Sequence, residues 1–115
     1  MDQAGYRRGL ELLNDREFFE AHEVLEDVWR AAPAGEKRFL QGLIQLAVAL
    51  HHYSRGNRAG AQSVLRRAGR NLSHYGKAFA GINPATISET AFRWSEALDR
   101  GESLPDFAGI DFQES

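Results

Sequence analysis

The sequence contains no cysteine in its 115 residues, and this absence excludes several classes of site at once. Disulfide frameworks, thiolate zinc sites, iron–sulfur clusters and cysteine nucleophiles all require a thiol. No apolar run approaches the roughly 20 residues that a membrane helix needs. The first residues, Met1-Asp2-Gln3, have neither the basic nor the apolar region of a secretion signal. We therefore expect a cytoplasmic protein without a membrane partner.

An excess of charge of one sign is also missing. The 14 Lys and Arg residues nearly balance 16 Asp and Glu residues, for a formal net charge of −2 with neutral histidines. No global field therefore draws the chain to a nucleic acid, and we do not expect such a partner. The most basic stripe is that of Arg66, Arg67, Arg70, His74 and Lys77. Runs of this kind are usually solvated helix faces, and no aromatic residues interleave with it to stack on bases.

The common catalytic motifs are absent as well. The chain has no G-x-G-x-x-G, no Walker A motif and no G-x-S-x-G nucleophile elbow. None of its four histidines has a Glu three residues before it, which excludes the Glu-x-x-His pairs of di-iron bundles. The zincin motif H-E-x-x-H is missing too, but the segment from His22 to Glu26 has the related form H-E-x-x-E.

What the sequence does have is helical periodicity. Apolar residues recur at helical spacing in five segments, about 3–13, 17–31, 36–55, 58–75 and 84–100. The third is apolar on nearly all sides, which is typical of a central helix. Asp15 is suited to cap the second helix, and Asn83 followed by Pro84 to start the fifth. No segment alternates with period two for long enough to predict a sheet.

We therefore predict an all-α fold, a single-domain bundle of four to five antiparallel helices over residues 1–115. The tail after about residue 101 contains several apolar residues and is expected to pack back in part. The pattern A-x-x-V-L occurs at Ala21–Leu25 and again at Ala61–Leu65. With short connections, this echo is compatible with two stacked tetratricopeptide-like α-hairpins plus a C-terminal helix. An ordinary bundle remains the alternative.

The second predicted helix carries the first candidate site. His22 and Glu26 are four residues apart and therefore share one side of the helix, while Glu23 points further toward solvent. His22 falls inside the apolar arc, between Phe18 and Leu25. A buried imidazole needs partners for both nitrogens, and Glu26 is the natural local one. Three interpretations stay open: a core histidine held by a carboxylate, a ligand-binding or catalytic pair, and a misplaced helix phase.

The central helix carries a polar stripe of Gln41, Gln45 and His52. Buried amides and imidazoles cost free energy unless they are hydrogen-bonded. We therefore expect the stripe to face the polar residues of the second helix, with Trp29 packed beside them. Such a cluster is either a closed hydrogen-bond network or a site for a divalent ion or a small polar ligand. His51 lies on another side and is expected to be a packing or rim residue.

The segment Phe18–Trp29 follows the pattern F-x-E-A-H-E-x-x-E-x-x-W, and Gln41–Ala47 reads Q-G-L-I-Q-L-A. Together these segments resemble the small all-helical proteins catalogued as domain of unknown function 309. The resemblance extends over about residues 6–75 and, more loosely, the C-terminal helix. It implies a compact helical bundle without an established activity, although the family is sometimes labelled as predicted metal-dependent hydrolases. The matching positions are His22, Glu23, Glu26, Trp29, Gln41, Gln45 and His52. Where the family often has a Tyr, this chain has His51.

Two functions follow from these observations. We favour a non-catalytic scaffold or interaction module, in which the polar cluster serves the structure and no cofactor is needed. The alternative is a metal-dependent hydrolase or small-ligand-binding protein that holds a divalent ion. The residues assigned to this alternative are the metal ligands His22, Glu26 and His52, the ligand contacts Trp29, Gln41 and Gln45, and the catalytic carboxylates Glu23 and Glu26. The sequence identifies no partner and leaves a homo-oligomer open.

Overall fold

The computed structural model describes residues 1–113 and contains five helices. They are α1 (Gln3–Asn14), α2 (Phe18–Arg30), α3 (Ala34–Ser54), α4 (Arg58–Leu72) and α5 (Pro84–Asp99). No strand occurs in this part of the chain, where one isolated antiparallel bridge pairs Phe79 with Ile82. The all-α prediction is confirmed. The largest error in a helix end is at α4, which ends at Leu72 rather than near Tyr75.

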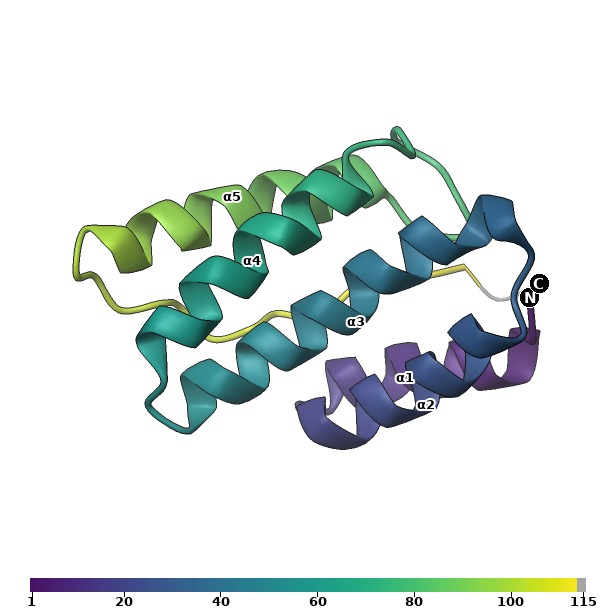
Figure 1. Cartoon of the computed structure of the whole chain (residues 1–115), viewed down its shortest axis with the longest axis horizontal. Coiled ribbons are helices and arrows are strands. Elements are labelled where there is room, and N and C mark those ends of the chain that lie inside the picture. Colours follow the sequence, from purple (N-terminus) through teal and green to yellow (C-terminus); the bar gives the residue numbers. More distant parts are fainter. Residues whose placement is uncertain (114–115) are drawn as a thin grey trace.

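Each helix packs mainly on the next one along the chain. In Figure 1, α2, α3, α4 and α5 lie side by side, with α1 behind α2. The tail after α5 returns in an extended form behind α3 toward the N-terminus, so the prediction that it packs back is confirmed. None of the helices described is long and apolar enough to cross a membrane.

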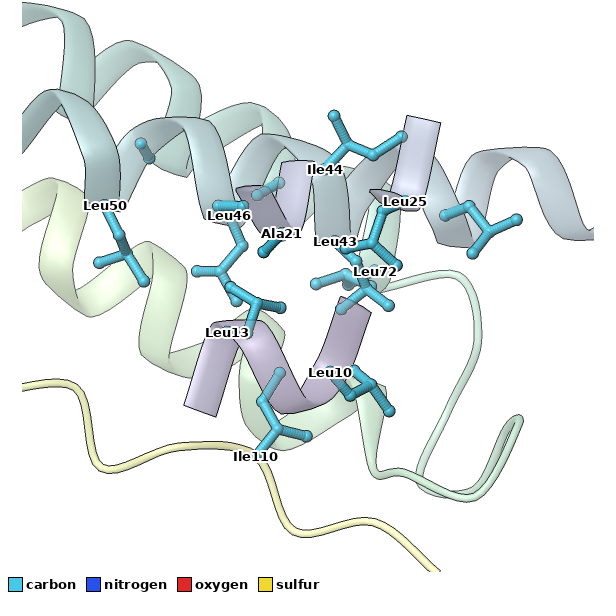
Figure 2. Packing of buried hydrophobic residues seen from close by; sticks show 14 of the residues in the cluster. Leu10, Leu13, Ala21, Leu25, Leu43, Ile44, Leu46, Leu50, Leu72 and Ile110 are labelled. Atoms are coloured by element: carbon cyan, nitrogen blue, oxygen red, sulfur yellow. The ribbon is translucent and has the colours of Figure 1, made fainter. Parts of the chain in front are cut away.

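The core is a single apolar cluster to which all five helices and the tail contribute. Its largest part comes from α3, whose buried residues face both neighbours: Phe39, Leu40, Gly42, Leu43, Ile44, Leu46, Ala47, Ala49 and Leu50. Figure 2 shows leucines of α1 together with those of α3, and Ile110 of the tail beside them. Full burial of one such side chain contributes roughly 1.5–3 kcal/mol. Because α3 supplies the largest part of the core and packs on both α2 and α4, its predicted central position is confirmed.

One predicted helix cap is confirmed and one is wrong. Asn83 Oδ1 accepts the Thr86 N–H at 3.2 Å, as expected of a cap before Pro84. Asp15 does not cap α2, because it lies at the C-terminal end of α1, where its N–H donates to the Glu11 carbonyl. Arg16 then adopts a left-handed φ of 63° that reverses the chain. α2 consequently begins only after Glu17, without a side-chain cap.

Helices α3 and α4 approach closely at a glycine. A Cβ atom on Gly42 would lie 2.7 Å from Leu72 Cγ and 3.3 Å from Asn71 Cβ, so a larger residue would push the helices apart. The inner face of α4 is the predicted one, since Leu65 is fully buried and Arg66 exposed. This close approach brings the α4 side chain Asn71 within hydrogen-bond distance of Gln45 on α3.

Candidate functional site

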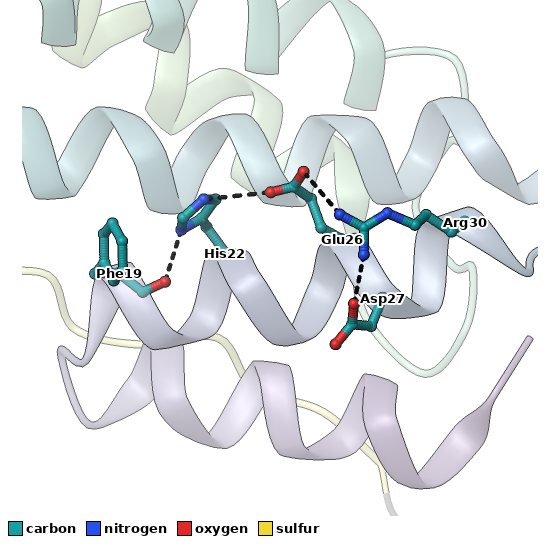
Figure 3. Close-up of polar contacts among 5 residues, drawn as sticks. All are labelled: Phe19, His22, Glu26, Asp27 and Arg30. Carbon is teal, nitrogen blue, oxygen red and sulfur yellow. Dashed lines mark hydrogen bonds and ion pairs between the residues drawn. The ribbon is translucent and has the colours of Figure 1, made fainter.

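A row of local contacts runs along the outer side of α2 (Figure 3). His22 Nδ1 lies 2.6 Å from the Phe19 carbonyl oxygen, and His22 Nε2 lies 3.3 Å from Glu26 Oε2. Further along, Arg30 pairs with Asp27 at 2.6 Å and with Glu26 at 3.8 Å. The spacing of three and four residues between partners places these side chains next to one another on the helix surface. His22 and Glu26 are therefore paired, as predicted.

This pair lies at the rim of the core and not within it. The side chain of His22 is 21% exposed and that of Glu26 is 39% exposed. The inner face of α2 is formed by Ala21, Leu25 and Val28. In the described chain, the buried polar side chains are two serines of α5. The predicted buried polar cluster is thus wrong, because the buried stripe of α2 is narrow and His22 lies just outside it.

The polar residues Gln45 and His52 of α3 form their hydrogen bonds with other residues than the predicted ones of α2. Gln45 Oε1 accepts a hydrogen bond from Asn71 Nδ2 at 2.7 Å, and Asn71 Oδ1 accepts one from Arg38 Nε at 3.0 Å. His52 Nδ1 lies 3.3 Å from Asn57 Nδ2, in the connection to α4. The expectation that these groups bond to α2 is therefore wrong. Gly42 explains the difference, because it lets α4 come close enough to satisfy Gln45.

Among residues 1–113, the remaining predicted site residues form no hydrogen bond or ion pair with His22 or Glu26. Trp29 is half-buried, and the Lys37 ammonium group stands 4.4 Å from its ring centroid while donating to its carbonyl oxygen at 2.9 Å. A cation over an indole face is a favourable contact. Gln41 is half-buried on α3, and Glu23 is exposed on α2.

The three proposed metal ligands are only partly brought together. His22 and Glu26 form a pair, whereas His52 bonds to Asn57. Within residues 1–113, no three His, Asp or Glu side chains gather into a group that could hold a metal ion. The Phe19 carbonyl can only accept a hydrogen bond, so His22 Nδ1 carries a proton and Nε2 is the nitrogen that faces Glu26. The contact with Glu26 becomes a charge-assisted hydrogen bond in the imidazolium form.

Two residues outside the predicted site, Phe19 and His51, complete this surface. Phe19 is 52% exposed and is the one large hydrophobic side chain left exposed in the described part. Its ring centroid lies 4.9 Å from that of His22 and 5.4 Å from that of His51. His51 belongs to the last turn of α3 and is half-buried, which confirms its prediction as a rim residue. His51, and not His52, is therefore the histidine of α3 that meets α2.

We call Phe19, His22, His51 and Glu23 the Phe19 patch, and Glu20 is the next residue of α2 after Phe19. Both carboxylates are exposed, and neither forms an ion pair within the described residues. Glu23 is one turn from Phe19 on the same side of α2. A signal for the patch was present in the sequence, because residues 19, 22, 23, 26 and 30 form a second stripe at helical spacing. The patch thus combines an aromatic ring with the carboxylate of Glu23, which has no ion-pair partner among residues 1–113.

The chain is similar to a known protein family and to two proteins of other organisms. The model of "Domain of unknown function (DUF309)" matches residues 6–64, just over half of the chain, from α1 into α4. The "Uncharacterized protein YpuF" of Bacillus subtilis (strain 168) is 47% identical over 58 residues, which are 50% of this chain and 33% of that protein. An "Uncharacterized protein" of Aquifex aeolicus (strain VF5) is 36% identical over 75 residues, 64% of this chain and 22% of that protein. The chain thus spans a third or less of the length of these relatives. The Phe19 patch lies inside the matched region. Because the family model matches more than half of the chain, the chain belongs to the DUF309 family.

Proposed function

We propose that this protein is a non-catalytic helical interaction module that binds a partner protein through the Phe19 patch. The observation that carries the proposal is the exposed Phe19 ring, which is held between His22 of α2 and His51 of α3. Aromatic residues, Phe among them, are enriched in protein–protein interfaces relative to the rest of the surface. A ring that neighbouring rings already hold in place loses little freedom when it is covered.

The charges around the ring indicate the chemistry of the partner. Within residues 1–113, neither Glu20 nor Glu23 forms an ion pair, whereas Arg30 at the other end of α2 is already paired with Asp27. A complementary segment would therefore place an apolar side chain on Phe19 and Lys or Arg residues beside the two glutamates. Such complementarity contributes to specificity and to the rate of association.

A selection from a random peptide library tests this proposal. Peptides are selected on the wild-type protein, and their affinities are then measured for Phe19→Ala and for the control Arg66→Ala, which changes an exposed residue of α4. We expect the selected peptides to combine an apolar residue with Lys or Arg. Phe19→Ala should weaken their binding at least about tenfold, or about 1.4 kcal/mol, and Arg66→Ala should leave it unchanged. Equal affinity for all three proteins, or no enriched peptide, would refute the proposal.

One observation favours a second function, metal-dependent hydrolysis. Metal-binding histidines usually donate their other ring N–H to a carbonyl or carboxylate, as His22 Nδ1 does to the Phe19 carbonyl. His22 Nε2 and Glu26 would then hold the ion, whose chemistry is to lower the pKa of a bound water. Glu23 would accept the proton. Two protein donors are fewer than the three of most catalytic zinc sites, so we rank this function second.

Thermal unfolding with Zn²⁺, Mn²⁺ or Ni²⁺ separates the two functions. A metal that binds the native state raises the melting temperature by mass action. The interaction module predicts the same melting temperature with and without metal. A rise in the wild type that disappears in both His22→Ala and Glu26→Ala, and persists in His52→Ala, would favour the metal site.

A further inference from the structure

A pocket lies between α5 and the extended tail that follows it. Its volume is about 400 Å³, which falls within the range of roughly 300–1,000 Å³ that is usual for small-molecule sites. One wall is the tail from Pro105 to Ile110, and Leu46 of α3 closes the pocket on the inner side. The other wall is one face of α5, formed by Thr86, Ile87, Thr90, Arg93 and Trp94.

The interior of the pocket is apolar and aromatic. The Phe107 ring of the tail lies edge to face with Trp94 of α5, at a centroid distance of 6.4 Å. Ile87 is half-buried, and Leu46 and Ile110 are 2% and 6% exposed. Sites for small molecules are typically lined in this way, with a few polar groups that fix the orientation of the ligand. The interior therefore suits an apolar group of a ligand.

The wall formed by the tail is held in place by the body of the protein. Asn14 Nδ2 of α1 donates to the Ile110 carbonyl at 2.9 Å, and Asn14 Oδ1 accepts from the Ile110 N–H at 2.6 Å. The Glu102 N–H donates to the Ala97 carbonyl at 2.9 Å, and the Glu102 carbonyl accepts from the Arg58 guanidinium at 2.6 Å. These bonds fix the tail on both sides of the stretch that lines the pocket. A wall that is already ordered loses little freedom when a ligand binds.

The two walls carry charges of opposite sign. Arg93 on α5 precedes Trp94, and Asp106 on the tail precedes Phe107. Both charged side chains are exposed, and neither forms an ion pair within residues 1–113. The Arg93 guanidinium donates one hydrogen bond to the Thr90 hydroxyl at 3.2 Å, and its five N–H groups allow more. The pocket thus offers a cation on one wall and an anion on the other, beside an apolar interior.

We propose that this pocket binds a free amino acid with an aromatic or branched apolar side chain. The side chain of the ligand packs against Trp94 and Ile87, its carboxylate pairs with Arg93, and its ammonium group pairs with Asp106. A purely apolar molecule, or one with a single charge, leaves at least one of these two charged residues without a partner. Because the family model matches residues 6–64, both walls lie outside the matched region. The pocket is also separate from the Phe19 patch, and this inference does not depend on that patch.

Isothermal titration calorimetry of the full-length protein with L-phenylalanine, L-tryptophan, L-leucine and L-isoleucine tests this proposal. We expect at least one of them to bind with a dissociation constant of about 1 mM or below. The amide of that amino acid lacks the carboxylate, and its N-acetyl derivative lacks the ammonium group. Each derivative should bind at least about tenfold more weakly, since it loses one charged contact. Failure of all four amino acids to bind in this range, or equal affinity for the derivatives, would overturn the proposal.

Two substitutions on opposite walls show whether the ligand lies in this pocket. Arg93→Gln should abolish the preference for the amino acid over its amide, and Asp106→Asn the preference over the N-acetyl derivative. Both residues are exposed, so the helical circular dichroism spectrum should stay unchanged. The control Arg66→Gln changes an exposed arginine of α4, outside the pocket, and should keep both preferences. If either preference survived in its variant, the ligand would lie elsewhere and the proposal would also be overturned.

Discussion

Substitution of Gly42 by alanine tests the close approach of α3 and α4 that orients the polar residues of α3. The new Cβ would lie 2.7 Å from Leu72 Cγ and 3.0 Å from Leu72 Cδ2. Overpacking of this kind costs typically about 1–3 kcal/mol, whereas Gly→Ala in a helix gains about 1 kcal/mol. We therefore expect Gly42→Ala to lower the free energy of unfolding by about 0–2 kcal/mol. Gly35→Ala, in the same helix with nothing within 4 Å, should raise it by up to about 1 kcal/mol.

Urea denaturation of the two variants measures this difference, provided that the slope of the transition is unchanged. Leu72→Ala supplies a further control, because it removes the two side-chain atoms closest to the new Cβ. In that background, the loss of free energy of unfolding caused by Gly42→Ala should be smaller than in the wild type by at least about 0.5 kcal/mol, because substitutions of residues in contact are not additive. If Gly42→Ala stabilised the wild type as much as Gly35→Ala does, the proposed close contact would be refuted.

Four further substitutions test the helix phases, a cap and a buried phenol. Leu65→Ala should lower the free energy of unfolding by about 2–5 kcal/mol and its exposed neighbour Arg66→Ala by less than about 0.5 kcal/mol, as chemical denaturation can measure. Asn83→Ala removes the bond to the Thr86 N–H and should cost about 0.5–2 kcal/mol in the same assay. Burial raises the pKa of the Tyr6 phenol, which donates to the Ala80 carbonyl at 2.8 Å. The folded state therefore retains this proton longer than the unfolded state does. Stability should fall as the pH rises above about 10, and less steeply in Tyr6→Phe.

The inner face of α4 could be predicted from the sequence, because apolar periodicity records which residues avoid water. Leu65 and Arg66 are adjacent in the chain, and the pattern of α4 alone placed one inside and the other outside. Asn83 could be predicted as a helix cap from its own residue type and from the proline that follows it. These features depend on a few neighbouring residues, and a single sequence contains that information.

The partners of the polar side chains could not be predicted in this way. Periodicity places Gln45 on one side of α3 but does not say which helix lies there, and the answer depends on the space left at Gly42. His51 and His52 differ by one position, or about 100° around a helix, so a small error of phase exchanges their surroundings. The contact of Asn14 with Ile110 joins residues 96 positions apart, and Asn14 by itself resembles an ordinary helix end.

The central claim is that the Phe19 patch binds a partner segment, and an NMR titration tests it most directly. A selected peptide that carries an apolar residue and Lys or Arg is added to ¹⁵N-labelled protein, and the amide shift changes are assigned. The account predicts that the changes cluster around Phe19, His22 and Glu23 of α2 and around His51 of α3, and that they disappear in Phe19→Ala. Shift changes confined to α4, α5 or the tail, or changes that persist in Phe19→Ala, would contradict it.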